Sequence, residues 1–381
     1  MVHLPDFKTI LDTKDHTYTI RMVRTVSERL ATSLDRDRIY RYRTETLAVL
    51  TTEESVDGRP TERVIEDLFL EPFNLEDKPV MLTARILTVP LSRMEDVDIV
   101  SVIEHGLVTE GLSPGVHLHR IDSKDIKGYL REQAIIRLMR NQLDEGEIDV
   151  VFQPILDLKR GRFTSAEALA RLSSEDLGDI KPSEFIPIAE RAGLIHALGM
   201  SVIRTSSRLM RKLQEKDSVI RQVAINLSSH QIADTSFSKS VVRTCKDEGI
   251  RPSSLSFEVT ESVWVRNNSD LLRLAKSFKN EGIKLLLDDF GTGYANLEAV
   301  YSGIFETVKF DGMLFRNLSK GPAGHDTIAN LIALFSSLGV KTTVEGVESP
   351  EQEHDAIAAK ADSLQGFLIK RPIPAAEILQ L

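Results

Sequence analysis

From residue 147 onward the chain alternates short apolar runs with stretches of helical period, and this alternation most constrains the fold. The apolar runs are Val150–Leu156, Phe163–Leu169, Val223–Leu227, Leu255–Val259, Lys284–Leu287, Thr307–Phe310, Lys341–Val344 and Ser363–Ile369. The segments with helical spacing between them are 199–214, 237–248, 269–281 and 325–338. Roughly eight alternating units in about 240 residues is the size of a (β/α)8 barrel. Periodicity alone leaves an open doubly wound sheet as the rival fold.

The chain divides near residue 125. Residues Tyr129–Leu143 carry apolar side chains at helical spacing with charges on the other face, which predicts a connecting helix. The earlier segments predict a compact α+β domain with helices and strands at 20–34, Ile39–Thr51, Pro79–Val89 and Asp96–Glu104. We therefore expect this smaller domain over 1–125, a connecting helix over 126–146 and a TIM-like α/β barrel over 147–381.

Composition excludes several classes of protein. The net charge of −9, from 57 acidic and 48 basic residues, argues against binding to a DNA or RNA polymer, which requires a basic face. Cys245 is the single cysteine, which excludes an intrachain disulfide and a thiolate metal site. No apolar run approaches 18 residues and the first residues lack a basic-then-apolar leader. We therefore expect a cytoplasmic protein without a membrane segment.

Polar residues follow almost every apolar run of the predicted barrel. They are Glu167, Asn226, Glu258 with Glu261, Asp288 with Asp289, Lys309 with Asp311, Glu345 with Glu348, and Gln365. The carboxyl ends of barrel strands face one rim, where active sites are built. Carboxylates gathered there repel one another unless cations neutralise them. Oxygen ligands favour Mg²⁺ or Mn²⁺, and two ions about 3.5–4 Å apart suit in-line displacement at phosphorus.

Each of these residues also has a simpler interpretation when it is taken alone. A carboxylate at a strand end is often a helix cap or half of a salt bridge. Asp288-Asp289-Phe290-Gly291 is also typical of a tight turn, and Lys309 of a surface lysine whose stem lies along apolar side chains. The conjunction of seven polar strand ends is what favours a catalytic site.

At these positions the sequence resembles the EAL domain family of cyclic di-GMP phosphodiesterases. The matching motifs are Gln153-Pro154-Ile155, Glu167-Ala168-Leu169 with Arg171, Phe185-Ile186-Pro187-Ile188-Ala189-Glu190, Asn226-Leu227-Ser228, Glu258-Val259-Thr260-Glu261-Ser262, Asp288-Asp289-Phe290-Gly291-Thr292-Gly293-Tyr294, Lys309-Phe310-Asp311, Glu345-Gly346-Val347-Glu348 and Gln365-Gly366-Phe367. They occur in the family's order over about residues 130–381. The family's fold, a modified (β/α)8 barrel, agrees with the alternation described above.

The resemblance implies a role for each matching position. A site for two ions, Mg²⁺ or Mn²⁺, would have the ligands Glu167, Asn226, Glu258, Asp288, Asp289 and Glu345. Lys309 would position the attacking water or neutralise phosphoryl charge, and Glu345 is the candidate general base. Glu261 would hold the loop that carries the two aspartates. The residues that would contact the dinucleotide are Gln153, Arg171, Glu348 and Gln365. The product would be linear pGpG.

Some positions depart from the family pattern. Leu172 and Ser173-Ser174 stand where the family commonly has tryptophan and His-Pro, and Gly303–Glu306 lacks the usual proline. Gly312 replaces an arginine. None of these changes removes a metal ligand, so they bear on affinity and rate more than on the chemistry.

The first 125 residues resemble the GGDEF diguanylate cyclase fold more faintly. Asp6–Asp12 resembles the stretch after that fold's first metal-binding strand, Val23–Leu30 resembles the helix that follows, and Arg43-Thr44-Glu45-Thr46-Leu47 stands where the signature would be. The signature glycines, which let the backbone approach nucleotide phosphates, are missing. Leu34 replaces the arginine of the family's inhibitory pattern. The resemblance implies a degenerate domain without cyclase activity, in a regulatory, dimerising or structural role.

Three functions remain open from the sequence. The first is a metal-dependent phosphodiesterase, which is a homodimer through its barrel if it follows the family. The second is a cyclic di-GMP receptor without turnover, and the third a scaffold that binds no nucleotide. Among other candidate residues, His117 and His119 would share a strand face, Cys245 is expected in a helix core, and Trp264 suits either the core or an interface.

Overall fold

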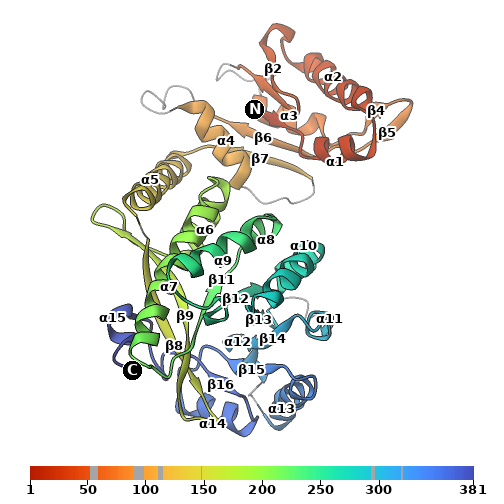
Figure 1. Ribbon diagram of the computed structural model, residues 1–381. Helices are drawn as coiled ribbons and strands as arrows, with labels where there is room; N and C mark the ends of the chain where they lie inside the picture. The colour runs from red at the N-terminus through yellow and green to blue at the C-terminus, as the bar shows by residue number, and fades with distance from the viewer. Residues whose placement is uncertain (52–58, 90–97, 110–114, 147, 293–296, 319–320) are drawn as a thin grey trace. The chain divides into compact units, whose positions relative to one another are not determined.

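In the computed structural model the chain forms two compact units, residues 1–133 and 134–381. The structure describes residues 1–51, 59–89, 98–109, 115–146, 148–292, 297–318 and 321–381 (Figure 1). The boundary between the units lies inside α5 (Ser123–Glu145), which extends beyond both ends of the predicted helix Tyr129–Leu143.

The first unit mixes strands and helices. Its elements are β1 (Val2–His3), α1 (Asp6–Thr13), α2 (His16–Ser33), η1 (Arg36–Arg38), β2 (Ile39–Arg43), β3 (Thr46–Val49), α3 (Thr61–Leu68), β4 (Phe73–Leu75), β5 (Lys78–Val80), β6 (Ala84–Thr88), α4 (Ile99–Thr109) and β7 (Val116–Arg120). The described strands form a sheet in the order β2-β3-β1-β6-β7, in which only β6 and β7 are parallel, and a separate β4–β5 hairpin (Figure 1).

The sheet of the first unit buries both of its faces. Ala84 and Ile86 of β6 pack with side chains of α1, α2 and α3, whereas Leu87 packs with α4 and the start of α5. Successive side chains of a strand point to opposite faces, so β6 contributes to two cores. The smaller α+β domain expected from the sequence is present.

Two segments predicted as single strands are each two strands. Ile39–Thr51 folds as the β2–β3 hairpin, whose turn falls on polar residues that have no apolar side chain to bury. Pro79–Val89 contains the end of β5 and all of β6. Between them Thr83 donates from its backbone nitrogen and its hydroxyl to Asp6 Oδ2, at 2.8 and 2.6 Å, which interrupts the extended run.

The second unit is a closed barrel. Its elements after α5 are β8 (Asp149–Asp157), β9 (Arg162–Ser174), β10 (Gly178–Ile180), α6 (Pro182–Arg191), α7 (Ile195–Glu215), β11 (Gln222–Asn226), α8 (Ser229–Ala233), α9 (Phe237–Asp247), η3 (Pro252–Ser254), β12 (Leu255–Thr260), α10 (Glu261–Asn280), β13 (Lys284–Phe290), α11 (Leu297–Tyr301), β14 (Phe305–Phe310), α12 (Gly312–Leu318), α13 (Pro322–Ser337), β15 (Lys341–Val344), α14 (Pro350–Ala358), β16 (Ser363–Leu364), β17 (Ile373–Pro374) and α15 (Ala375–Ile378).

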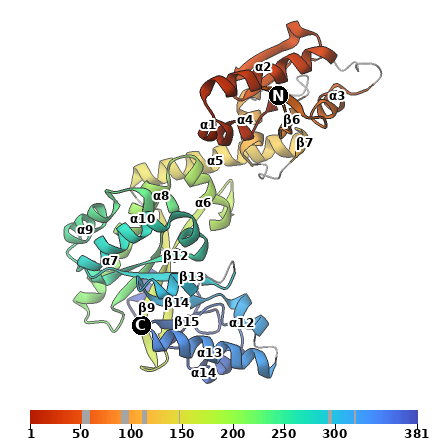
Figure 2. The same cartoon turned by 90° about the vertical axis from the view of Figure 1, so that its right-hand side faces the viewer.

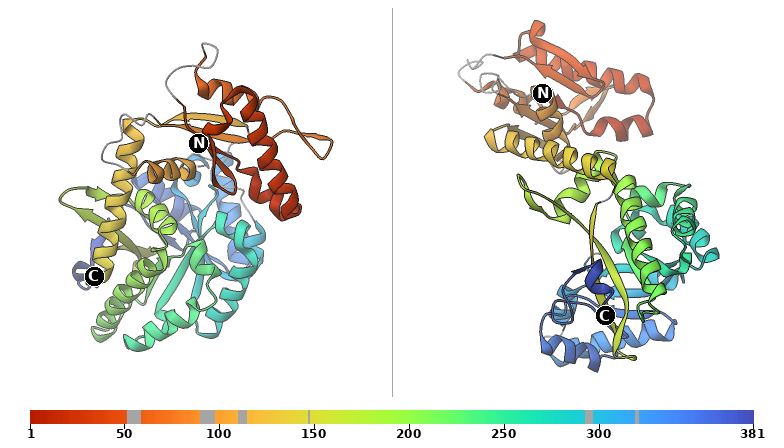
Figure 3. Two further views of the ribbon diagram at one scale, coloured as in Figure 1. Left: turned by 90° about the horizontal axis from the view of Figure 1, so that it is seen from above. Right: turned by 60° about the vertical axis from the view of Figure 1, so that its left-hand side comes forward.

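The barrel strands run in the order β9-β11-β12-β13-β14-β15-β16-β8, and pairing of β8 with β9 closes the ring. Helices α7, α9, α10 and α13 lie outside it (Figures 2 and 3). Phe257 of β12 stacks on Phe278 of α10 and meets Phe237 of α9 edge-on, and all three belong to the barrel's main apolar core. The predicted α/β barrel is therefore confirmed. Within the described residues, no helix combines the length and apolar character needed to cross a membrane.

One strand departs from a regular (β/α)8 barrel. β8 runs antiparallel to both β9 and β16. Only residues 158–161 connect β8 to β9. Such a link is too short for a helical crossover, so the two strands form a hairpin. The hairpin places Gln153 directly opposite Glu167 in the strand register.

Candidate active site

The polar strand ends predicted from the sequence meet at one rim of the barrel. Glu167 lies on β9, Glu258 on β12, Asp288 on β13 and Lys309 on β14, while Glu345 directly follows β15. Together with β11, which lies between β9 and β12, these strands pair in parallel and in register, apart from irregularities between β13 and β14. The parallel register therefore brings together residues that are up to 178 positions apart in the chain.

Lys309 is the cation at the centre of this group. Its side chain is 1% exposed, and its Nζ lies 2.7 Å from Glu258 Oε2 and 2.7 Å from Glu345 Oε1. Asp288 Oδ1 and Glu167 Oε2 lie 3.2 and 3.3 Å from the same nitrogen. Four carboxylates thus share one ammonium group, which leaves an excess of negative charge in a buried place.

This excess shifts the pKa values of the carboxyl groups. Burial and the neighbouring carboxylates raise the pKa of Glu345 to about 8, and burial with Asp288 raises the pKa of Asp289 to about 6. The pKa of Glu258 is raised well above its usual range by burial and by Glu167. Burial opposes the charge of Lys309, but the surrounding carboxylates raise its pKa well above the usual range. The site therefore favours binding of further positive charge.

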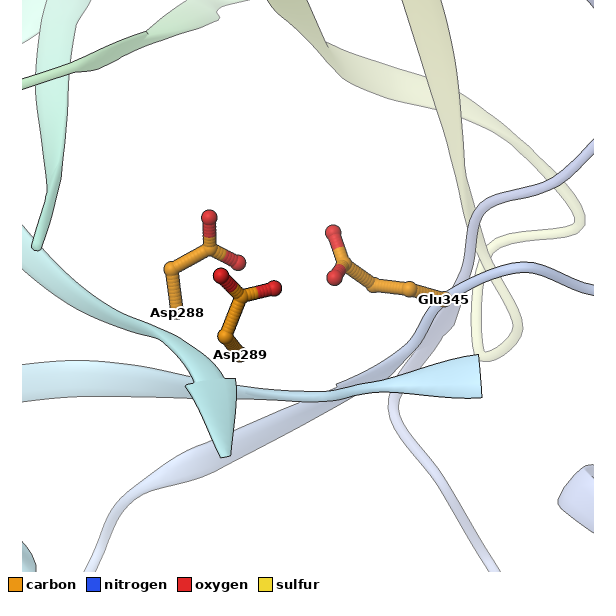
Figure 4. A group of neighbouring side chains, drawn as sticks. All are labelled: Asp288, Asp289 and Glu345. Carbon is orange, nitrogen blue, oxygen red and sulfur yellow. The ribbon is translucent and has the colours of Figure 1, made fainter. Parts of the chain in front are cut away.

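Asp288, Asp289 and Glu345 form a group that fits a cation. One carboxylate oxygen of each lies within 4.8 Å of the others, and the three side chains point toward one another (Figure 4). Asp289 has a positive φ of 54°, a backbone conformation that turns its side chain toward this group at some cost in strain. Buried Glu258 Oε1 has no hydrogen-bond partner among the described residues, and a bound cation would supply one.

Asn226 and Glu167 complete the set of predicted ligands. Asn226 Nδ2 donates to Glu167 Oε1 at 2.8 Å, so the amide oxygen of Asn226 is turned away and remains available to a cation. Burial works against the ionised form of Glu167, but Lys309 and the hydrogen-bond donors around it lower its pKa. An all-oxygen set of five carboxylates and one amide suits a hard divalent cation.

Glu261 lies beneath the loop after β13. It opens α10, its side chain is buried, and Glu261 Oε2 accepts a hydrogen bond from the Gly291 backbone nitrogen at 3.4 Å. Gly291 has φ of 95°, and a Cβ there would lie 2.1 Å from Leu314 Cδ2, so the loop needs glycine at this position. Gly293 and Tyr294 of the same motif lie outside the described residues.

The four residues predicted to bind substrate lie in different surroundings. Gln153 and Gln365 are buried and hydrogen-bonded to each other. Arg171 is partly buried on β9 and donates to the Ala170 carbonyl at 2.9 Å, and burial lowers its pKa although Glu167 opposes this. Glu348 is exposed and lies 3.5 Å from Arg316. Their contacts with a dinucleotide stay predictions.

A cavity of about 600 Å³ opens beside Asn226 and Arg171. Its wall is mainly apolar and comes from β9, β11, α6 and α7, with Phe185 on α6 and Leu198 on α7 among its lining. Sequence reasoning assigned no role to Phe185, although this residue belongs to the Phe185–Glu190 motif. The motif therefore marked these residues in the sequence, but it did not show that Phe185 lines a cavity.

The other candidate residues have structural surroundings. Cys245 is fully buried, and burial raises the pKa of its thiol to about 11. Trp264 is buried and lies edge-on to Phe305, with 6.0 Å between ring centroids. His119 Nε2 lies 3.0 Å from Asp125 Oδ2. Asp311 Oδ1 accepts from the Met313 backbone nitrogen at 2.8 Å and so caps α12.

Several curated relatives match about 60% of the chain, and one matches nearly the whole chain. Cyclic di-GMP phosphodiesterase PdeR of Escherichia coli is 31% identical over 237 residues, which are 62% of this chain and 36% of that protein. Cyclic di-GMP phosphodiesterase NbdA of Pseudomonas aeruginosa is 26% identical over 387 residues, which are 98% of this chain and 48% of that protein. The chain spans about a third of the length of the first curated relatives that it matches, at 29%, 38% and 36%.

A solved structure and a family model agree with these relatives. The PaMucR phosphodiesterase, solved in complex with c-di-GMP, has a TM-score of 0.60 and 30% identity, and the match covers 64% of this chain and 99% of that chain. The family model described as the EAL domain matches residues 136–372, which include every predicted metal ligand. The chain therefore belongs to the EAL domain family.

Proposed function

We propose that the chain hydrolyses cyclic di-GMP to linear pGpG. The observation that carries this proposal is the convergence of the carboxylates of Glu167, Glu258, Asp288 and Glu345 on buried Lys309. Relatives named as cyclic di-GMP phosphodiesterases and a structure with c-di-GMP bound support the choice of substrate. A receptor without turnover would not need so costly a gathering of buried charge.

Two divalent cations, Mg²⁺ or Mn²⁺, fit the oxygen atoms at this rim. The residues that would hold them are Glu167, Asn226, Glu258, Asp288, Asp289 and Glu345. When bound, such ions would neutralise the phosphodiester and make a water molecule acidic enough to attack phosphorus. Lys309 would keep the carboxylates together before and during this reaction, since its nitrogen already contacts four of them.

The remaining chemistry is proton transfer and charge stabilisation by residues of the chain. Glu345, with a pKa of about 8 without metal, would accept the proton of the attacking water. The water oxygen would bond to phosphorus as one P–O3′ bond breaks, which leaves a 5′-phosphate and a 3′-hydroxyl. Arg171, at the edge of the cavity, would bind a phosphate through its fork of donors, and Glu348 would contact the dinucleotide at the rim.

A homodimer through the barrel is part of the same proposal. Exposed apolar side chains lie on the helices that follow the catalytic strands: Val265 and Leu272 of α10, Leu297 and Tyr301 of α11, and Met313 of α12. A second copy covering them would contact the segment after Asp289. Sedimentation velocity of the wild type and of Tyr301→Glu tests this, and a monomeric wild type would contradict it.

The first unit is proposed to be a non-catalytic, GGDEF-like domain in a regulatory or dimerising role. The segment Arg43–Leu47 falls on the β2–β3 hairpin, and its turn has no glycine. Glu45 is the remaining acid of the signature. Incubation with GTP and Mg²⁺ should give no cyclic di-GMP, and a cyclic product would refute this assignment.

Chromatography of cyclic di-GMP incubated with the protein tests the main proposal. We expect pGpG with Mn²⁺ or Mg²⁺, none with chelator, and none from Glu167→Ala. Binding of cyclic di-GMP without product would assign the protein to the receptor class, and the departures at Leu172 and Gly303–Glu306 would then be examined first. Neither binding nor product would leave a structural scaffold.

A further inference from the structure

We infer that Gln153 and Gln365 form a hydrogen-bonded relay that orients the Glu167 carboxylate toward a bound metal ion. The relay consists of the Lys370 backbone carbonyl, the two glutamine amides and Glu167. The inference rests on the proposed function because it needs a metal at Glu167. It gives the two glutamines a positioning role that does not depend on contact with substrate.

The relay is continuous in the structure. Gln153 Nε2 donates to the Lys370 carbonyl at 3.0 Å, and Gln153 Oε1 accepts from Gln365 Nε2 at 3.1 Å. Gln365 Nε2 also donates to Glu167 Oε2 at 2.7 Å. The shortest of the three hydrogen bonds is the one to the carboxylate, as expected for an ionised acceptor.

The two ends of the relay determine the orientation of both amides. A backbone carbonyl can only accept, so the nitrogen of Gln153 must face Lys370 and its oxygen must face Gln365. An ionised Glu167 can also only accept, so Gln365 must present its nitrogen to both neighbours. The nitrogen of Gln365 has two hydrogens, and the relay uses both of them.

The barrel holds the relay rigidly in place. Gln153 is 8% exposed and Gln365 is 4% exposed, so bulk water has little access to compete for the hydrogen bonds of either side-chain amide. Gln153 and Glu167 are opposite residues of the antiparallel β8–β9 pair and therefore point to the same face. Gln365 is followed by Gly366, where a Cβ would lie 2.1 Å from the Val347 carbonyl oxygen. This close backbone approach fixes the amide beside Glu167.

The relay and Asn226 together constrain both oxygens of Glu167. Oε2 accepts from Gln365, and Oε1 accepts from Asn226 Nδ2 at 2.8 Å. Rotation of the carboxylate would break one or both hydrogen bonds, so its remaining lone pairs have a defined direction. Buried partners that orient a ligand in this way commonly change metal affinity by about 10–100-fold when they are removed.

One atom of the relay stays open to a ligand. Gln365 Oε1 is buried and has no hydrogen-bond partner among the described residues. This oxygen can accept from a water or from an N–H group of a nucleotide base, while the nitrogen of the same amide orients Glu167. Gln153 has no such open acceptor, because its Oε1 already accepts from Gln365. Substitution of Gln153 therefore tests the positioning role without removing an open acceptor for the substrate.

The test is the affinity of the metal-free full chain for Mn²⁺ alone, measured by electron paramagnetic resonance without nucleotide. We expect Gln153→Leu to weaken Mn²⁺ binding about tenfold, although Gln153 makes no hydrogen bond to the described Glu167 side chain, and Gln365→Leu to weaken it by about 10–100-fold. The double variant should be no weaker than Gln365→Leu within about twofold, because the two residues act in series. Gln222→Leu, on β11 away from the rim, should bind Mn²⁺ like the wild type.

Unchanged Mn²⁺ affinity in Gln153→Leu and Gln365→Leu would overturn the relay and leave the glutamines as substrate contacts alone. If Gln365→Leu does not fold, as judged by circular dichroism, the Mn²⁺ affinity of Gln153→Leu still tests the relay. Weakened Mn²⁺ binding in a protein that does not hydrolyse cyclic di-GMP would support the relay and refute the proposed reaction. A wild type that binds no Mn²⁺ would overturn the relay together with the metal site.

Discussion

The two units of the molecule differ in that only the barrel, among the described residues, buries a cluster of carboxylates around a lysine. In the first unit, Arg21 with Glu76 and Arg43 with Glu104 form ion pairs in which each side chain is at least one-third exposed. In the barrel, Lys309 is 1% exposed and lies among four carboxylates. Exposed pairs contribute little to stability and cost little to make, whereas a buried excess of like charge is costly.

Exposed ion pairs are common on any protein surface, whereas a buried excess of carboxylates needs a reason other than stability. A fold needs no arrangement in which carboxyl pKa values are raised to about 6 and about 8, and hydrophobic residues of similar volume would be cheaper there. Groups with strongly shifted pKa values in one place are typical of functional sites. Within the described residues, the barrel rim has such a cluster of carboxylates, and the first unit has none of this kind.

The largest expected effect comes from removing the central cation. Lys309→Met should lower hydrolysis of cyclic di-GMP by at least about 100-fold and, because the carboxylates lose their counter-ion, should lower the free energy of unfolding of the metal-free protein by about 3–5 kcal/mol. Arg43→Met in the first unit should leave hydrolysis unchanged and the melting temperature within about 2 °C of wild type. Denaturant titration measures the free energy of unfolding, thermal melts measure the melting temperature, and product chromatography measures hydrolysis. Equal destabilisation by Lys309→Met and Arg43→Met would contradict the difference between buried charge in the barrel and exposed ion pairs in the first unit.

A smaller effect is expected from the anchor of the loop after β13. Glu261→Ala removes the acceptor of the Gly291 backbone nitrogen but no predicted metal ligand, so kcat should fall by about tenfold. Glu281→Ala, at the exposed C-terminal end of the same helix, is the matched control and should be fully active. Steady-state kinetics with saturating Mn²⁺ measure the difference. Wild-type kcat in Glu261→Ala would contradict the anchoring role.

The pH dependence of stability should come next in size. In the folded, metal-free protein the pKa of Glu345 is about 8 and that of Asp289 about 6, both above the ordinary value near 4, so the folded state binds more protons than the unfolded chain. The free energy of unfolding should therefore fall as pH rises from about 5 to 8. Mn²⁺ binds the deprotonated carboxylates and should reduce this fall. Thermal melts with chelator and with Mn²⁺ test this, and identical pH profiles would contradict it.

The smallest expected effect lies in the first unit and has the opposite sign. Burial and the charges of Arg85 and Arg43 lower the pKa of His3, although Glu45 opposes them. The unfolded chain then binds the proton more tightly, so stability from this group is lost as pH falls below about 6.5. An NMR titration, with the His3 signal assigned through His3→Gln, should show a midpoint below 6.5. A midpoint above 6.5 would contradict the burial effect.

Much of the barrel and its site could be predicted from the sequence, because each depends on local pattern. Strands such as Leu255–Thr260 are apolar runs that end in polar residues, and the helical segments between them have a clear period. The parallel arrangement of consecutive strands then requires their ends to meet. The first unit was harder to predict. The segment Ile39–Thr51 has strand-like residues throughout, and only the pairing of β2 with β3 shows that it is a hairpin.

Sequence by itself determined which side chains are available to the site and that they occur in the order of the EAL domain family. It also determined that the candidate ligands at the strand ends offer oxygen atoms, since they are Asp, Glu and Asn side chains. The tertiary structure alone decided that Lys309 lies inside the carboxylate group and that antiparallel β8 brings Gln153 to Gln365, which in turn donates to Glu167. The physical reason is that strand direction and side-chain register arise from long-range pairing, which no local pattern of residues encodes.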